Sequence, residues 1–147
     1  MLSRPVCPDA AALIRGGADF PQLVGEIQFF QECGRVLVLA RLSGFPRETS
    51  DFFAMHIHDG ESCSGTDFSG TGGHYNPSAE AHPYHAGDLP PLMSCLGSAF
   101  LAVRTARFRV CDIIGKTVVI HNAPDDFRSQ PAGNSGTKIA CGVIRRK

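Results

Sequence analysis

The 147-residue sequence lacks tryptophan, has only two tyrosines and carries no excess of either charge. Fourteen basic residues balance fourteen acidic ones, which argues weakly against nucleic acid or an anionic membrane as a partner, because both usually select a basic surface. No apolar run approaches the roughly 18 residues that a transmembrane helix needs. We find no internal repeat and no linker, so we expect one domain over residues 1–147, long enough to bury a core.

Two further features are missing: a signal peptide and a paired-cysteine motif. The segment MLSRPVCPDAAALIRGG has no apolar stretch of about 7–15 residues after its first arginine, so we expect a cytoplasmic location unless a leader has been removed. Six cysteines are many for such a protein, yet no CxxC occurs, which disfavours a zinc ribbon or a thioredoxin-like site. The cysteines are Cys7, Cys33, Cys63, Cys95, Cys111 and Cys141.

Strand-like segments make up most of the chain. Residues 23–32 and 35–45 alternate apolar and polar side chains around Cys33-Gly34, a turn signal, and so predict a hairpin. Further strands are predicted at 52–58, 98–108, 116–122 and 138–146. Residues 10–16 favour another strand, although PDAAALIR could also begin a short helix. Seven or eight short strands indicate an all-β antiparallel sandwich or barrel.

Two long polar segments, 59–97 and 122–137, interrupt the strands and are rich in Gly, Pro, Ser and Asp. Structureless loops of that length in a compact domain are usually functional, or are held by something other than a hydrophobic core. We expect metal ligation to fix the first loop in place.

Histidines concentrate in and around the first loop. His56 and His58 are two residues apart in a predicted strand, so both imidazoles point to one face and can reach one metal ion. An HxH pair alone is equally compatible with an exposed strand edge. His74 follows in GGHYNP, where glycines let the backbone turn sharply. The remaining candidates are His82, His85, Asp88 and His121.

The spacing of these residues matters more than any single motif. His82, His85 and Asp88 follow one another at intervals of three, and two imidazoles with a carboxylate and one more nitrogen make a tetrahedral site suited to zinc. HxxH in a loop is by itself a weak signal, and a lone histidine such as His121 at a strand end is more often a core or edge residue. Together, however, these motifs account for every histidine in the chain.

The order HxH, GGHYNP, HAGDLP, VVIH and GNSGTKIACGVI resembles copper–zinc superoxide dismutase, over roughly residues 10–146. The resemblance implies an eight-stranded antiparallel Greek-key β-barrel, flattened like an immunoglobulin sandwich, with two long functional loops outside it. It implies copper and zinc as cofactors and superoxide as the small-molecule substrate.

Position by position, the resemblance implies two metal sites that share one histidine. The copper ligands would be His56, His58, His74 and His121, and the zinc ligands would be His74, His82, His85 and Asp88. Four nitrogens suit Cu(II), and three nitrogens with a carboxylate suit zinc. A shared imidazole must lose both ring protons, which two flanking cations make favourable.

The resemblance also assigns roles around the metals. Asp125 would accept hydrogen bonds from His56 and His82, and Cys63 would form a disulfide with Cys141 that ties the loop to the barrel. The other cysteines are expected as thiols, with a Cys7–Cys33 pair as the less favoured alternative.

The family has arginine where this chain has Lys138, beside the copper mouth. Lysine keeps the charge that attracts anions but loses the fixed fork of donors, so positioning should suffer more than attraction. Both long loops are also shorter than in familiar eukaryotic members, which implies a weaker electrostatic funnel.

The function implied is dismutation of superoxide to O₂ and H₂O₂ by Cu(II)/Cu(I) cycling, with His74 and Lys138 as the catalytic residues. One alternative is a non-catalytic copper/zinc-binding domain of the same fold, serving as a copper carrier or structural module. Another is a zinc-only scaffold for a protein partner. The sequence leaves open whether the chain is a homodimer or a monomer, and whether a copper donor protein delivers its metal.

Overall fold

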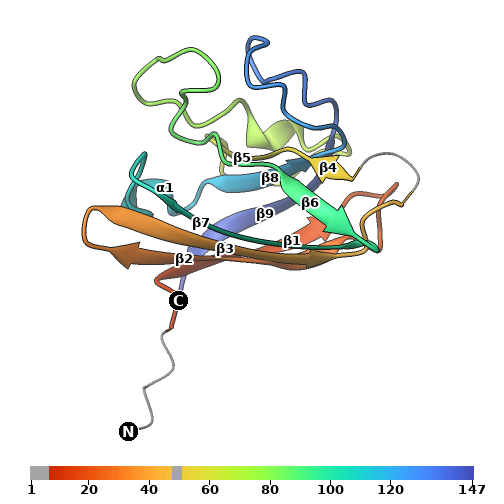
Figure 1. Cartoon of the computed structure of the whole chain (residues 1–147), viewed down its shortest axis with the longest axis horizontal. Coiled ribbons are helices and arrows are strands. Elements are labelled where there is room, and N and C mark those ends of the chain that lie inside the picture. Colours follow the sequence, from red (N-terminus) through yellow and green to blue (C-terminus); the bar gives the residue numbers. More distant parts are fainter. Residues whose placement is uncertain (1–6, 48–50) are drawn as a thin grey trace, which may run out of the picture.

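The computed structural model describes residues 7–47 and 51–147, which form nine antiparallel strands and very little helix (Figure 1). The strands are β1 (Ala10–Gly16), β2 (Val24–Glu32), β3 (Arg35–Ser43), β4 (Phe52–Phe53), β5 (Met55–His58), β6 (Leu92–Cys95), β7 (Ser98–Thr105), β8 (Thr117–His121) and β9 (Lys138–Arg146). A 3₁₀ turn η1 (Ser69–Thr71) and one short helix α1 (Val110–Ile113) complete the described elements. Neither is long and apolar enough to cross a membrane.

The strands form one sheet in the order β4-β6-β7-β3-β2-β1-β9-β8-β5. Its two ends, β4 and β5, are separated only by Ala54, so one segment pairs with β6 at one end and with β8 at the other. This arrangement nearly closes the sheet into a barrel, and the all-β prediction is confirmed. β3 pairs with β7 instead of β4, the non-sequential neighbour expected of a Greek key.

The count of nine strands differs from the expected eight because Ala54 interrupts the predicted strand 52–58. The Ala54 amide donates to the carbonyl of Ala123, and its carbonyl accepts from the amide of His121, so Ala54 bonds to the end of β8 and the residues just after it, outside the regular register of β5 and β8. If β4 and β5 are counted as one broken strand, the barrel has eight.

Besides the short turn η1, two elements lie where the sequence predicted none. β6 lies inside the polar segment 59–97, and α1 follows β7, which ends at Thr105 and not at residue 108. Residues 10–16 form strand β1, so the alternative of a short helix there is wrong.

The barrel interior is apolar because the strands alternate in burial. On β3, Val36, Val38, Ala40 and Leu42 are buried while the residues between them are not. On β5, Met55 and Ile57 join the same core, so His56 and His58 must point away from it. The loops at 59–91 and 122–137 lie together on that outer side, beyond β5 and β8 (Figure 1).

Candidate metal centre

Three of the histidines come from two paired strands on the wall of the barrel. Residues on β5 and β8 pair in antiparallel register, with His56 opposite Val119. His56, His58 and His121 expose 0%, 2% and 4% of their surface, although they point out of the barrel. The loops must therefore cover them, which explains how imidazoles can be buried outside a hydrophobic core.

The first loop lies against β5 through backbone hydrogen bonds. The Ile57 amide donates to the carbonyl of Gly87, and the Tyr75 amide donates to the carbonyl of Ile57. Gly87 is required here, because a β-carbon would lie 2.2 Å from the Ile57 carbonyl oxygen. This close approach places His74 beside His58 and Asp88 beside His56.

The structure brings all the predicted ligands together in two groups. Within each group the donor atoms lie within 4.8 Å of one another, and His74 belongs to both. The first group consists of His56, His58, His74 and His121, and the second of His74, His82, His85 and Asp88.

Protein partners occupy one ring nitrogen of three of these histidines. His56 Nε2 lies 2.8 Å from Asp125 Oδ2, His82 Nε2 lies 2.8 Å from Asp125 Oδ1, and His58 Nδ1 lies 2.8 Å from the Gly72 carbonyl oxygen. Carboxylate and carbonyl oxygens only accept, so these nitrogens carry the protons. His56 Nδ1, His58 Nε2 and His82 Nδ1 are therefore left as lone-pair donors facing the groups.

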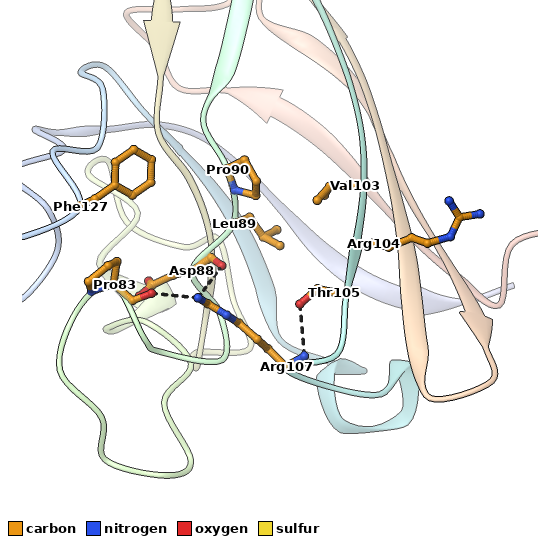
Figure 2. A pocket seen from close by; sticks show the side chains of 9 residues that line it. All are labelled: Pro83, Asp88, Leu89, Pro90, Val103, Arg104, Thr105, Arg107 and Phe127. Carbon is orange, nitrogen blue, oxygen red and sulfur yellow. Dashed lines mark hydrogen bonds between the residues drawn. The ribbon is translucent and has the colours of Figure 1, made fainter.

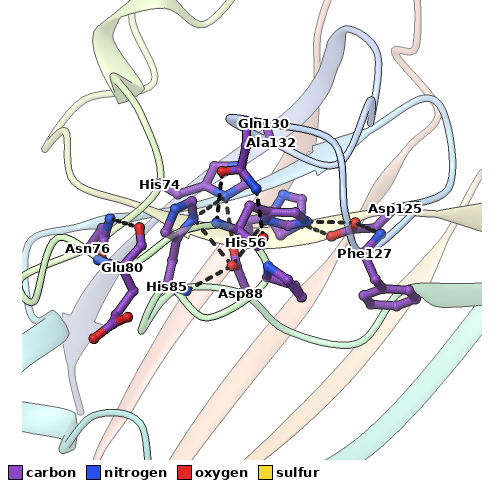
Figure 3. Close-up of polar contacts among 12 residues, drawn as sticks. His56, His74, Asn76, Glu80, His85, Asp88, Asp125, Phe127, Gln130 and Ala132 are labelled. Atoms are coloured by element: carbon purple, nitrogen blue, oxygen red, sulfur yellow. Dashed lines mark hydrogen bonds and ion pairs between the residues drawn. The ribbon is translucent and has the colours of Figure 1, made fainter.

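His74 presents a nitrogen to each group. Its Nδ1 lies 2.8 Å from Asp88 Oδ1 and 3.2 Å from His85 Nδ1, in the second group (Figure 3). Its Nε2 is buried and has no hydrogen-bond partner in the described part of the chain. A single imidazole thus stands between the two groups with both nitrogens directed at candidate metal positions.

Unpartnered nitrogens show that the residues fit metal ions. Besides His74 Nε2, the buried atoms without a hydrogen bond are His56 Nδ1, His82 Nδ1 and His121 Nδ1 among the described residues. His82 Nδ1 lies 3.0 Å from Asp88 Oδ2, but without hydrogen-bond geometry. Buried polar atoms cost free energy unless something satisfies them, and cations would do so at His74 Nε2, His56 Nδ1 and His82 Nδ1. His121 instead directs its Nε2 at the first group, 3.3 Å from His58 Nε2. The donor sets, four nitrogens in one group and three nitrogens with a carboxylate in the other, are of the kind that holds transition-metal ions.

Burial keeps these imidazoles neutral, as metal ligands must be. It lowers the pKa of His58 to about 2 and that of His121 to about 3, and it also lowers the pKa of His56. Burial would raise the pKa of Asp125, but hydrogen bonds from His56, the Phe127 amide and His82 outweigh it and hold that pKa at about 2. The site therefore combines neutral nitrogens with an ionised carboxylate.

Asp125 connects the two groups through ring nitrogens that do not face the candidate metal positions. Its carboxylate bonds both His56 and His82, and it also accepts from the amide of Phe127 (Figure 3). A β-carbon on Gly133 would lie 2.0 Å from Asp125 Oδ1, so only glycine fits beside it. The geometry agrees with the predicted orienting role of Asp125.

Gln130, in the second loop, was not predicted. Its side-chain oxygen accepts from the His82 amide at 3.0 Å, and its nitrogen donates to the His82 carbonyl at 2.8 Å. These paired bonds connect the second loop to the first. No spacing rule in the sequence indicates such a contact between a side chain and a distant backbone.

The predicted disulfide is present. Cys63 of the first loop is bonded to Cys141 of β9, across a sequence separation of 78. Phe68 and Val119 pack with this bridge in a small cluster separate from the barrel core. The remaining cysteines are exposed thiols, so no Cys7–Cys33 pair is formed.

Lys138 lines a cleft together with His58, His74 and His121. Its ammonium donates to Thr71 Oγ1 at 2.8 Å and to the Gly72 carbonyl at 3.0 Å, so it is held against the first loop. Burial lowers its pKa, an effect that Asp67 partly opposes. The location is compatible with attracting anions, and that role stays a prediction.

The fold and the site define a metal-binding β-barrel protein with two adjoining His-rich groups. The chain belongs to the copper/zinc superoxide dismutase (SODC) family, whose model matches residues 23–144.

Curated relatives agree with this assignment. Superoxide dismutase (Cu-Zn) 2 of Aquifex aeolicus is 30% identical over 139 residues, 84% of this chain and 80% of the relative. Superoxide dismutase (Cu-Zn) of Legionella pneumophila is 31% identical over 151 residues, 97% of this chain and 91% of the relative. Extracellular superoxide dismutase (Cu-Zn) of Homo sapiens is 35% identical, covering 84% of this chain and 56% of the relative.

Proposed function

We propose that this protein is a superoxide dismutase, converting two superoxide anions and two protons to O₂ and H₂O₂. The observation that carries the proposal is His74, which presents Nδ1 to one group and an unpartnered Nε2 to the other. We assign copper to the group of His56, His58, His74 and His121, and zinc to the group of His74, His82, His85 and Asp88.

Bound copper would supply one-electron oxidation and reduction, and bound zinc a fixed positive charge without redox change. The chain's own residues would supply the proton and attract the anion. His74 can hold a proton at Nε2 and deliver it to the peroxide product, while its Nδ1 stays anchored in the second group. Asp125 keeps His56 and His82 oriented throughout.

Lys138 would draw superoxide toward the cleft by its charge. Its ammonium is committed to Thr71 and Gly72, so we expect attraction more than direct positioning of the anion. These contacts support the expectation from the sequence that Lys138 attracts the anion, as arginine would, but positions it less well.

The test is a dismutation assay on purified protein loaded with copper and zinc, compared with an equal concentration of free copper. Activity well above free copper is expected. Activity no higher than that of free copper would favour the non-catalytic metal-binding alternative. His74→Ala should lose the activity and weaken both metals, whereas a variant with full activity and native affinities would refute the bridging role.

A further inference from the structure

We propose that Arg107 is a positioning residue for the zinc group, acting from the barrel side of the first loop. Its Nη1 donates to the carbonyls of Pro83, His85 and Asp88, at 2.9, 3.2 and 3.2 Å (Figure 2 draws two of these bonds). Two of the three acceptors belong to residues of the second metal-binding group.

The anchor of Arg107 is the end of a barrel strand. The residue follows β7 by two positions, and its amide donates to Thr105 Oγ1 at 3.2 Å. Its other neighbour, Phe108, is buried in the barrel core. The backbone of Arg107 is therefore fixed by the barrel, whereas its guanidinium reaches into the loop.

The turn that Arg107 contacts is also held to β5, where the Ile57 amide donates to the Gly87 carbonyl. Within it, the His85 amide donates to Asp88 Oδ2 and the Asp88 amide donates to the His85 carbonyl, so both are local bonds. Asp125 and Gln130 hold His82 from the second loop. Arg107 thus adds a second link from this turn to the barrel, at the end of β7, and hydrogen bonds from a charged donor are stronger than neutral ones.

A positioning role and a purely electrostatic role predict opposite changes in zinc affinity when Arg107 is replaced. If the residue acted through its positive charge alone, removing it would relieve repulsion and tighten zinc binding. If it positions the His85–Asp88 turn, removing its donors should weaken zinc binding by about 10- to 100-fold, the usual cost of losing an outer hydrogen-bonding partner. The direction of the change therefore separates the two roles.

The experiment compares wild type with Arg107→Met, which keeps an apolar stem but no donors. Zinc affinity is measured by competition with a chelating indicator, and the Cu(II) group is monitored by its EPR spectrum. We expect zinc affinity to fall while the copper spectrum, recorded with zinc at saturation, stays unchanged, because the guanidinium of Arg107 bonds carbonyls of the first loop and not the strands β5 and β8. Unchanged or tighter zinc binding would overturn the proposal. So would a copper spectrum that stayed altered in Arg107→Met even with zinc at saturation.

Arg104→Met is the matched control, because Arg104 lies on β7 and pairs with Glu32, away from the loop. Its zinc affinity should equal that of wild type, and a fall as large as that of Arg107→Met would contradict the positioning role. Should Arg107→Met fail to fold, Arg107→Gln takes its place, since its shorter amide cannot span the three acceptors. The same fall is then expected, and wild-type affinity would overturn the proposal.

The inference rests on the proposed metal centre. The measurement on the wild type distinguishes a failure of the metal centre from a failure of the role of Arg107. A wild-type protein that bound no zinc would refute the centre itself. A wild type that bound zinc no more tightly than Arg107→Met would refute only the role of Arg107.

Discussion

The barrel interior buries apolar side chains, whereas the loops at 59–91 and 122–137 bury mainly imidazoles, carboxylates and hydroxyls. In those loops the buried polar residues are Thr71, His82, His85, Asp88, Asp125 and Ser135, and the buried large apolar ones are Phe68 and Leu89. Apolar burial stabilises without direction, but buried polar groups stabilise only when each finds its partner. The barrel should therefore fold without metal, and the loops should depend on it.

A core substitution should have the largest effect on the barrel and little on the metals. Phe29 is fully buried on β2, which contributes no residue to either metal-binding group. Phe29→Ala should lower the free energy of unfolding by about 3–5 kcal/mol, because a large cavity replaces the ring. Chemical denaturation measures this loss, and zinc affinity of the folded fraction should stay unchanged. A parallel loss of zinc affinity would show that the two regions are not independent.

Breaking the disulfide should have the next largest effect, concentrated in the first loop. Cys63→Ser opens a closure of 78 residues, at an expected cost of about 2–4 kcal/mol in the free energy of unfolding. Thermal denaturation of the oxidised proteins is the measurement. Cys95→Ser, which changes an exposed thiol, is the control and should stay within about 0.5 kcal/mol of wild type.

Asp125→Ala should weaken both metals at once, since its carboxylate bonds a histidine of each group. We expect a loss of about 10- to 100-fold in each affinity. Titration of copper and zinc separately, each with the other site filled, measures it. The carboxylate of the neighbouring Asp126 accepts hydrogen bonds from Arg128 and Ser129 and from no candidate metal ligand among the described residues, so Asp126→Ala should leave both affinities near wild type. If Asp125→Ala weakened one metal alone, the carboxylate would not link the groups.

The smallest effect concerns the charge at the cleft. Because burial lowers the pKa of Lys138 below its usual value of 10.5, its ammonium loses its proton at a lower pH than an exposed lysine would. Attraction of superoxide is present below that pKa and is lost as pH rises through it, by up to about tenfold in kcat/KM. Lys138→Arg should keep the alkaline rate, since arginine stays protonated. An identical alkaline fall in both proteins would rule out Lys138 as its cause.

Much of the fold and of the metal-binding groups could be predicted from the sequence because two kinds of signal were strong. Period-two alternation located the hairpin of β2 and β3, and the ordered histidine motifs located both groups. β6 was missed because it has four residues and lies inside a polar segment rich in glycine and proline.

Arg107 and Gln130 were missed for a different reason. Both act through hydrogen bonds to backbone atoms that lie 19 to 48 residues away in the sequence. Such contacts depend on how the loops pack, and neither residue type at those positions is unusual. The family motifs pointed to the metal ligands and to Asp125, but the contacts of Arg107 and Gln130 become visible only in three dimensions.

The central claim is that one shared metal centre holds both loops on a barrel that folds without metal. Amide hydrogen exchange tests this claim most directly, by comparing the metal-free protein with the protein loaded with copper and zinc. We expect amides of β1, β2, β3 and β9 to be equally protected in both forms. Residues 59–91 and 122–137 should gain protection together when the metals bind. Protection of the loops without metal, or loss of barrel protection with the metals removed, would contradict this account.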